Sequence, residues 1–292
     1  MSDTFKRLAL WAAIVAALYG VSTLFDLGDL TGPRRPLPPD PGGGAWIRSE
    51  PAAAPVGSTP DNASIDMIVA ESTLAGKDVI GTAFLVAPKT WVTAAHVLED
   101  CKAGYVRVQG TWRQVRQNQT HPSADVAVLV TDSREAPPVL GVTDRPPVLD
   151  QDGFHVGYPQ GVPSTVRTKF IGMARIRHGK PGSAVEMGWV WAELERQPPT
   201  TGPLGGISGG PQVDRTGAVQ GVTILYAERS ARLTTTPVSR VREVLPDNVP
   251  HVQVGGARID ETDFVAEGEQ ARATSAVALV FCSASGHTRP RR

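Results

Sequence analysis

The chain has 292 residues, and its 29 Lys and Arg residues balance 29 Asp and Glu residues, so the formal net charge at pH 7 is zero. Because this balance gives no overall basic surface, we do not expect nucleic acid as a partner. The 30 Gly and 25 Pro residues disfavour a large helical bundle, and the 2 cysteines exclude both a multi-disulfide framework and a four-cysteine zinc site.

The N-terminal segment has the pattern of an exported protein. Residues 8–25 are uncharged and follow Lys6 and Arg7, so they predict a transmembrane signal-anchor with residues 1–7 in the cytoplasm. A cleaved signal peptide is the alternative and predicts secretion. In both cases the remainder of the chain is expected on the periplasmic or extracellular side of the membrane. Residues 26–62 are rich in Pro and Gly and predict a spacer, because such a segment buries no core.

Residues 63–250 predict a folded domain of β structure. Short runs of Val, Ile, Thr and aromatic residues are separated by turn residues, as in GTAFLVAP, TWVTAAHV, DVAVLVT and AVQGVTILYA. Runs of this length and spacing are typical of an all-β sandwich or barrel. Val238, Val241 and Val244 have helical spacing and predict a short helix at the end of the domain. A parallel βαβ fold is disfavoured, because the strands precede the helix.

Three segments of this domain carry residues suited to catalysis. His96 stands in TWVTAAHVLEDC, Asp125 in HPSADVAVLV and Ser208 in GPLGGISGGPQVD. Each alone also fits an ordinary structural role, as a packed histidine, a turn aspartate and part of a glycine-rich loop. Together they provide a hydroxyl nucleophile, an imidazole that takes its proton and a carboxylate that orients the imidazole, as acyl transfer requires. Gly206 lets the backbone present N–H groups to a developing oxyanion.

The segments TAAHV, DVAVL and GxSGGP together resemble the three signatures of the trypsin-like (chymotrypsin-family) serine proteases. The resemblance covers about Ile65 to Leu245 and implies an all-β fold of two six-stranded antiparallel β-barrels, here with a short C-terminal helix and an extension. It implies His96 as general base, Asp125 as its orienting carboxylate and Ser208 as nucleophile of a serine endopeptidase. The N–H groups of Gly206 and Ser208 would form the oxyanion hole. It further implies a polypeptide substrate and neither metal nor cofactor, and it leaves the oligomeric state open.

Two departures from the digestive members of that family are informative. Ile207 precedes the serine where those enzymes have an aspartate that pairs with a newly cut N-terminus, so that activation switch is not expected. Val97 follows the histidine where a cysteine is usual. Both features resemble bacterial, Deg-type members, which normally continue into a PDZ domain. Because too few residues follow His251 for such a domain, we expect a bacterial-type protease without one.

The residue preference of the substrate pocket is less clear from the sequence. Gly202 stands six residues before the serine, where trypsin has an acidic residue, so a preference for Arg or Lys is not supported. The strand expected to pair with bound substrate contains Thr223, Ile224 and Leu225. Tyr226 falls near a position where glycine keeps the pocket open. If Tyr226 lines the pocket, the pocket is narrow and apolar and suits small aliphatic residues; the alternative is that it points to solvent.

One cysteine lies inside the β domain and the other follows it. Cys101 follows His96 closely, and Cys282 ends the run SAVALVFC, which predicts a strand and is too short to span a membrane. Since the expected compartment permits disulfides, we expect Cys101 and Cys282 to pair and to tie a C-terminal extension, residues 251–283, to the first barrel. Two unpaired cysteines are the alternative. Residues 284–292 are expected to be a disordered tail.

Two other functions compete with the protease interpretation. The first is a protease-fold binding or regulatory protein with a latent or occluded active site. The second is an esterase that uses the same triad; the α/β-hydrolase form is disfavoured because its nucleophile precedes its histidine. The protease interpretation also predicts that Asp125 is buried and that the pKa of His96 is perturbed.

Overall fold

The computed structural model describes residues 67–70, 76–178, 184–245, 258–286 and 290. The expected cytoplasmic segment, signal-anchor and spacer (1–7, 8–25 and 26–62) lie outside the described residues. Most of the expected tail also lies outside them. Within the described ranges, no helix combines the length and the apolar character needed to cross a membrane.

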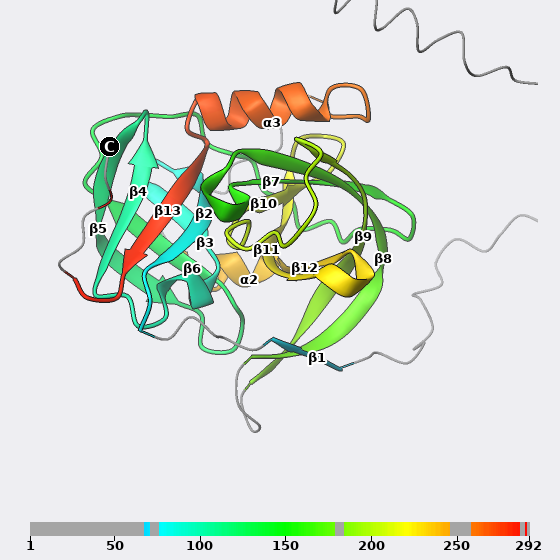
Figure 1. The fold of residues 1–292 in the computed structure, drawn as a ribbon, viewed down its shortest axis with the longest axis horizontal. Coiled ribbons are helices and arrows are strands. Elements are labelled where there is room, and N and C mark those ends of the chain that lie inside the picture. The colour runs from blue at the N-terminus through cyan, green and yellow to red at the C-terminus, as the bar shows by residue number, and fades with distance from the viewer. Residues whose placement is uncertain (1–66, 71–75, 179–183, 246–257, 287–289, 291–292) are drawn as a thin grey trace, which may run out of the picture. The chain divides into compact units, whose positions relative to one another are not determined.

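The first barrel consists of six antiparallel strands, one of which comes from the C-terminal part of the chain (Figure 1). Its strands are β2 (Val79–Ala87), β3 (Thr90–Thr93), β4 (Ala103–Val108), β5 (Thr111–Thr120), β6 (Ala127–Thr131) and β13 (Val277–Ser283). They are hydrogen-bonded in the closed order β13-β2-β3-β6-β5-β4, so β13 fills the place between β2 and β4. The strand expected in SAVALVFC is thereby confirmed.

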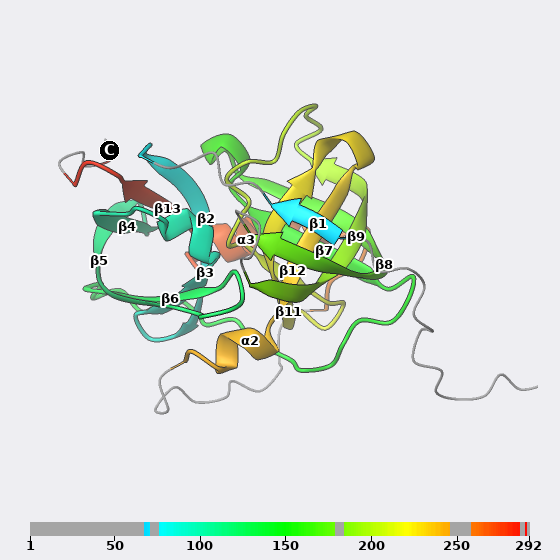
Figure 2. The same ribbon diagram turned by 90° about the horizontal axis from the view of Figure 1, so that it is seen from below.

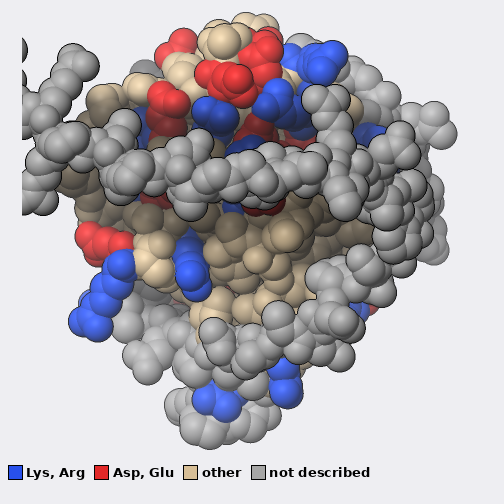
Figure 3. Space-filling model, turned by 90° about the vertical axis from the view of Figure 1, so that its right-hand side faces the viewer, with Lys and Arg blue, Asp and Glu red and all other residues tan. Residues whose placement is uncertain are grey.

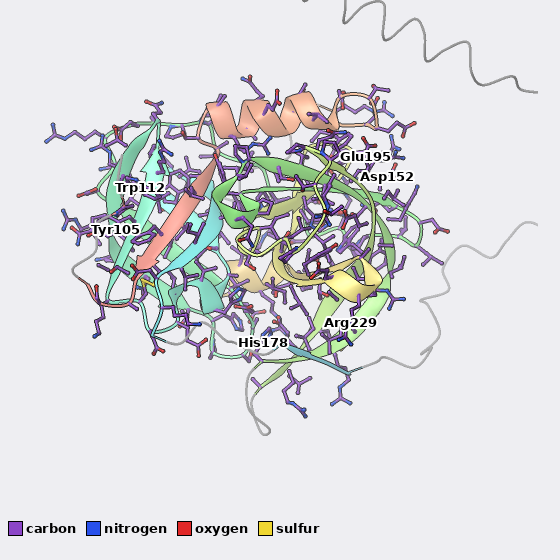
Figure 4. The ribbon with its side chains drawn as sticks, in the orientation of Figure 1. Tyr105, Trp112, Asp152, His178, Glu195 and Arg229 are labelled. Atoms are coloured by element: carbon purple, nitrogen blue, oxygen red, sulfur yellow. A yellow bond between two sulfur atoms is a disulfide. The ribbon has the colours of Figure 1, made fainter. Side chains whose placement is uncertain are left out.

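Aromatic rings hold the outer side of β13 on this barrel. The ring of Phe281 lies 6.5 Å from that of Tyr105 on β4 and 6.2 Å from that of Trp112 on β5, and Figure 4 labels both partners. Aromatic pairs at such distances add stability beyond the surface they bury. The C-terminal strand is therefore fastened to the barrel by side chains as well as by its backbone.

The second barrel also has six antiparallel strands (Figure 2). They are β7 (Asp152–Gly157), β8 (Ser164–His178), β9 (Val185–Gln197), β10 (Pro211–Val213), β11 (Val219–Ala227) and β12 (Arg232–Pro237). The order is β8-β7-β10-β11-β12-β9, and pairing of β8 with β9 closes the barrel. A further strand, β1 (Met67–Ala70), pairs in parallel with the end of β8. The two six-stranded barrels confirm the expected fold class.

The helical elements are short and pack on the barrels. They are α2 (Ser239–Arg242), α3 (Phe264–Ala273) and the 3-10 turns η1 (Ala95–Leu98), η2 (Pro159–Gly161) and η3 (Glu228–Ser230). The expected helix at the end of the β domain is confirmed, with Val238, Val241 and Val244 all buried.

Helix α3 was not expected from the sequence. Two of its side chains hold it on the second barrel. The Phe264 ring stacks on the Phe154 ring of β7 with centroids 6.0 Å apart, and Arg272 Nη1 donates to the Ser164 carbonyl of β8 at 2.8 Å. Only Phe264 and Gly268 of the helix are buried, so it has no apolar stripe that a sequence pattern could reveal. Gly268 allows the helix to approach closely, because a Cβ there would overlap Thr165 of β8.

A hydrophobic core joins the two barrels. It contains Phe84 and Val92 from the first barrel, Phe154 and Val222 from the second, and Val241 from α2. Strand β2 is buried along nearly its whole length, as expected for a strand that faces its own barrel on one side and the neighbouring barrel on the other. The barrels are thus held together by apolar packing, and the loops at their junction are placed relative to one another.

The expected disulfide joins Cys101 to Cys282, with the two Cα atoms 5.4 Å apart and 181 positions apart in sequence. Cys282 belongs to β13 and is fully buried. The bond therefore ties the C-terminal strand to the segment that follows η1, as the sequence analysis predicted. In the loop-entropy model a closure of this length stabilises the fold by roughly 4–5 kcal/mol.

The face of the molecule shown in Figure 3 carries acidic and basic side chains mixed together on its upper part. Asp152, which Figure 4 labels, has a side chain only 2% exposed and lies 2.8 Å from Lys169 Nζ. It also contacts Arg215 and, at 3.8 Å, Arg167. Because three cations surround it, the burial of this carboxylate is compensated.

Candidate active site

His96 stands on η1, the short 3-10 turn that follows β3 almost directly. Val97 and Leu98 of the same turn are buried in the core of the first barrel and anchor it. The His96 side chain nevertheless keeps 23% of its surface exposed. The imidazole is therefore fixed in place and still reachable by a ligand.

Asp125 lies two residues before β6, and the pairing of β3 with β6 brings it to His96. Thr93 at the end of β3 pairs with Ala127 at the start of β6, so the segment after one strand meets the segment before the other. The His96 N–H donates to Asp125 Oδ1 at 2.9 Å, and His96 Nδ1 lies 2.5 Å from Asp125 Oδ2. The Asp125 side chain is only 5% exposed, which confirms its expected burial.

The two groups shift each other's pKa. Burial by itself lowers the pKa of His96, but the charge of Asp125 and its hydrogen bond raise that pKa above its ordinary value. Burial by itself raises the pKa of Asp125, but the charge and hydrogen bonds of His96 lower it. The expected perturbation of the His96 pKa is confirmed. The carboxylate stays ionised while the imidazole takes up a proton.

Ser208 lies in the loop between β9 and β10, against the segment that carries His96. Its carbonyl accepts a hydrogen bond from the Thr82 N–H of β2 at 2.8 Å. The next residue, Gly209, has a φ of +88°, and a Cβ there would overlap the Thr82 carbonyl and lie 2.9 Å from the Ala94 nitrogen. Only glycine fits this approach, which holds the serine beside the histidine segment.

The Ser208 hydroxyl points to the second barrel. Its Oγ donates to the Ile224 carbonyl of β11 at 3.5 Å, and it makes no hydrogen bond with His96 within the part of the chain that the structure describes. The structure thus joins His96 to Asp125 by hydrogen bonds and places Ser208 nearby without linking it to the ring. Catalytic hydrogen bonds are often long or unformed until a substrate binds.

The backbone at Gly206 is shaped as an anion site requires. Gly206 has a φ of +101°, and a Cβ there would lie 2.7 Å from the Tyr158 carbonyl. Its own carbonyl accepts a hydrogen bond from Thr82 Oγ1 at 2.8 Å. Among the described residues, the N–H groups of Gly206 and Ser208 find no acceptor. Two backbone donors therefore remain available at the expected oxyanion hole.

Ile207, between these two donors, is 1% exposed and packs in the core of the second barrel. An aspartate at this position would place an unpaired charge among Trp, Leu and Val side chains. The burial gives a physical reason for the apolar residue that the sequence shows here.

The expected substrate strand runs next to the serine loop. The Gly209 N–H donates to the Thr223 carbonyl at 2.7 Å, and the Thr223 N–H donates to the Gly210 carbonyl at 2.8 Å. The pairing of β11 with β12 shifts register between Thr223 and Leu225, so Ile224 has no partner in that ladder. The Ile224 carbonyl is consequently free to meet the Ser208 hydroxyl.

The remaining pocket residues are joined by a side chain that the sequence analysis did not single out. Arg196 of β9 donates to the Gly202 carbonyl at 3.0 Å and to the Tyr226 hydroxyl at 2.6 Å, and its guanidinium lies 5.3 Å from the Tyr226 ring centroid. Glu193 pairs with the same guanidinium at 2.5 Å. Tyr226 is half-buried and packs against the second barrel. It therefore does not simply point to solvent, and its surroundings include an ion pair as well as apolar residues.

Thr82 is a further residue that no motif revealed. It is fully buried, donates to the Gly206 carbonyl and accepts from the Tyr158 N–H at 3.0 Å. Its hydroxyl links β2 of the first barrel to two loops of the second. Within the described residues, no three His, Cys, Asp or Glu side chains gather as metal ligands would.

The chain is similar to known proteins of the trypsin-like peptidase type. Residues 81–222 match the family model of the trypsin-like peptidase domain. Among curated proteins, none matches the chain. The active form of the Rv3671c protease from M. tuberculosis is 20% identical with a TM-score of 0.50, over 70% of this chain and 97% of that one. The MamO protease domain from Magnetospirillum magneticum is 18% identical with a TM-score of 0.45, over 57% and 95% of the two chains. At such identities, the likeness to the first structure concerns the fold.

Proposed function

We propose that the protein is a serine endopeptidase that uses His96, Asp125 and Ser208 as its catalytic triad, since residues 81–222 match the family model of the trypsin-like peptidase domain. The observation that carries the proposal is the Asp125 carboxylate, buried and hydrogen-bonded to both Nδ1 and the backbone N–H of His96. This arrangement leaves Nε2 of the ring as the proton acceptor. The His96 ring lies beside the Ser208 loop, where the N–H groups of Gly206 and Ser208 have no acceptor among the described residues.

In the proposed reaction, the Ser208 hydroxyl turns from the Ile224 carbonyl to His96 Nε2 and attacks the substrate carbonyl carbon. His96 takes the hydroxyl proton, and Asp125 stabilises the imidazolium that forms. The N–H groups of Gly206 and Ser208 bind the negative oxygen of the tetrahedral intermediate. His96 then gives the proton to the departing amine, which leaves an acyl-enzyme. His96 then takes a proton from water, whose oxygen attacks the acyl carbon, and gives that proton to Ser208 Oγ as the acyl–oxygen bond breaks.

We expect the pocket to take small side chains, because Arg196 bridges Gly202 and Tyr226 across its expected site. The Tyr226→Gly variant removes both the ring and one hydrogen bond of the guanidinium. It should cleave after larger residues than the wild-type protein does. Cleavage of a peptide library, with the products sequenced, measures this change, and an unchanged preference would place the pocket elsewhere.

The expected signal-anchor and the periplasmic or extracellular location belong to this proposal. The supporting observation is the uncharged run of residues 8–25 behind Lys6 and Arg7. Protease protection of spheroplasts and intact cells measures on which side the barrels lie. Barrels that remain protected after the outer face has been exposed would contradict the location.

Labelling with a fluorophosphonate tests the triad most directly. The full chain in detergent should react at Ser208, while Ser208→Ala and His96→Ala should not react. Ser230→Ala, which alters an exposed serine on η3, is the matched control and should label as the wild type does. Labelling that persists in Ser208→Ala would overturn the assignment of the nucleophile.

One observation favours the rival function of a protease-fold binding protein with an occluded site. The Tyr226–Arg196–Gly202 bridge spans the expected pocket, and the Ser208 hydroxyl faces Ile224. If the folded wild-type chain neither labels nor cleaves peptides while Tyr226→Gly does both, the site is latent. If neither reacts, the binding function replaces the proposed one.

A further inference from the structure

The carboxylate of Asp125 faces a second histidine. His178, the last residue of β8, has its Nδ1 3.8 Å from Asp125 Oδ2, the same oxygen that lies 2.5 Å from His96 Nδ1. Figure 4 labels His178 at the end of the β8–β9 hairpin, beside β1. One oxygen of the proposed triad therefore lies within ion-pair distance of two imidazoles from different barrels.

Glu186 of β9 holds both His178 and the backbone of Asp125. Its Oε1 lies 2.5 Å from His178 Nε2 and accepts the Asp125 N–H at 3.0 Å, while Oε2 accepts the Thr236 hydroxyl at 3.1 Å. The Glu186 side chain is only 1% exposed. A buried carboxylate with three donors on it is a rigid support, so the position of His178 relative to Asp125 is determined by the second barrel.

Two residues contact the Asp125 carboxylate within the described part of the chain. They are His96, through its backbone N–H and its ring, and His178. The β8–β9 hairpin is therefore the part of the second barrel that reaches this carboxylate.

We propose that His178, held by Glu186, is a positioning residue of this site. It holds the Asp125 carboxylate in place from the second barrel, and it weakens the attraction of that carboxylate for a proton on His96. The inference rests on the proposed protease function. It assigns to the hairpin a role that no signature motif indicates.

The charges around His178 determine the sign of the effect. The groups that face it are Asp125 from the first barrel, Glu186 from β9 and, beyond Asp125, His96 on η1. Strand β1, which pairs with this end of β8, has the sequence MIVA and adds no titratable side chain. Burial by itself lowers the pKa of His178, but the hydrogen bond with Glu186 and the charges of Asp125 and Glu186 raise it above its ordinary value, against the charge of His96. Because this repulsion acts on both rings, a protonated His178 disfavours a proton on His96. Its removal should therefore raise the pKa of His96.

Kinetics of His178→Gln in the full chain test this role. We expect kcat to fall about tenfold with KM nearly unchanged, because a loosened catalytic group loses rate rather than binding. The acid limb of kcat/KM should move up by roughly one pH unit. Glu186→Gln, which releases His178, should also lower kcat with KM nearly unchanged. The control is Arg175→Gln, which removes a positive charge from an exposed position of the same strand and should leave both parameters unchanged.

A second measurement does not depend on turnover. Histidine-labelled full chain carrying Ser208→Ala, titrated by ¹⁵N NMR, reports the pKa of His96 itself. That pKa should rise when His178→Gln is added and stay constant when Arg175→Gln is added. An unchanged His96 pKa, or a loss of activity that is equal at all pH values and follows the melting temperature, would overturn the inference. Failure of the wild-type chain to label with fluorophosphonate would refute the protease function instead, and the titration would still decide the coupling.

Discussion

The imidazole of His96 serves as a base only when it is neutral, and Asp125 sets the pH at which it becomes so. The charge and hydrogen bond of Asp125 outweigh the effect of burial and raise the pKa of His96. The same contact keeps Asp125 ionised. At the scale of single residues, the proposed activity thus depends on the hydrogen-bonded pair of His96 and Asp125, on two segments that adjoin strands of the first barrel.

The first prediction concerns this pair. Because protonated His96 cannot accept the serine proton, kcat/KM should rise with pH through a limb centred above the ordinary histidine pKa of about 6.5. Asp125→Asn removes the charge that raises the pKa, so its limb should lie at lower pH and its kcat should fall by up to about 10⁴-fold. A pH–rate profile on a fluorogenic peptide measures both. A flat profile across the neutral range would exclude His96 as the base.

A second prediction concerns His155, a histidine buried inside the second barrel. Its Nδ1 lies 2.9 Å from Thr223 Oγ1 and its Nε2 lies 3.2 Å from Thr168 Oγ1, and burial lowers its pKa to about 3. In the unfolded chain His155 therefore takes up a proton near pH 6.5, whereas in the folded chain it stays neutral until the pH is much lower. The free energy of unfolding should fall as pH drops from about 6.5 toward 3, by up to about 1.4 kcal/mol per pH unit.

Denaturant unfolding between pH 7 and pH 4 measures this acid sensitivity. The variant His155→Gln starts less stable at pH 7, because it disturbs a packed site, but it should lose less stability on acidification than the wild type. Parallel pH dependences of the two proteins would mean that His155 does not control acid stability.

At the scale of elements, β13 completes the barrel that carries His96 and Asp125. It pairs with β2 on one side and with β4 on the other, with Val280 opposite Gly81 and Val106. Val280 is fully buried, whereas Leu279 beside it is half-buried. A strand from the end of the chain is thus required to close the sheet on which the proposed base is mounted.

The third prediction compares these two neighbours. Val280→Ala removes two methyl groups from the barrel core and should cost about 2 kcal/mol of unfolding free energy, including the cavity it leaves. Leu279→Ala should cost less, although more atoms are removed, because its side chain keeps contact with solvent. Chemical denaturation gives both values. Equal or reversed losses would contradict the placement of Val280 inside the barrel.

At the scale of the whole molecule, the disulfide and α3 bind the C-terminal part of the chain to both barrels. Cys282 fastens β13 to Cys101, while Phe264 of α3 stacks on Phe154 of the second barrel. The closed loop spans 181 positions and contains Asp125 and Ser208, whereas His96 lies just before it. Its cross-link restricts the unfolded chain more than the folded one.

The fourth prediction is that reduction of Cys101–Cys282 destabilises the native chain by roughly 4–5 kcal/mol. The double variant with Cys101→Ser and Cys282→Ser should unfold at the same denaturant concentration with or without reductant. The wild type should approach that value only when reduced. If reductant leaves wild-type unfolding unchanged, the bond contributes nothing to stability.

The sequence by itself determined the features that depend on short segments. The strand-length runs predicted an all-β sandwich or barrel, and the valines at helical spacing predicted α2. The three signature segments pointed to His96, Asp125 and Ser208, and their resemblance to a known family implied two barrels. Such segments can be recognised in a sequence because the local backbone restricts which residues fit. At position 209, for example, a Cβ would overlap the Thr82 carbonyl, so only glycine fits. The pairing of Cys101 with Cys282 was also predicted, because the expected compartment permits disulfides.

Only the tertiary structure decided what lies between distant segments. It placed β13 between β2 and β4, and it placed α3, with no apolar stripe of its own, on β8. It joined Gly202 to Tyr226 through Arg196, and it brought His178 and Glu186 to Asp125. These contacts arise where strands far apart in sequence pair around a closed barrel. No periodicity or spacing along the chain records such pairing, because the register of each strand is settled only when its neighbours are in place.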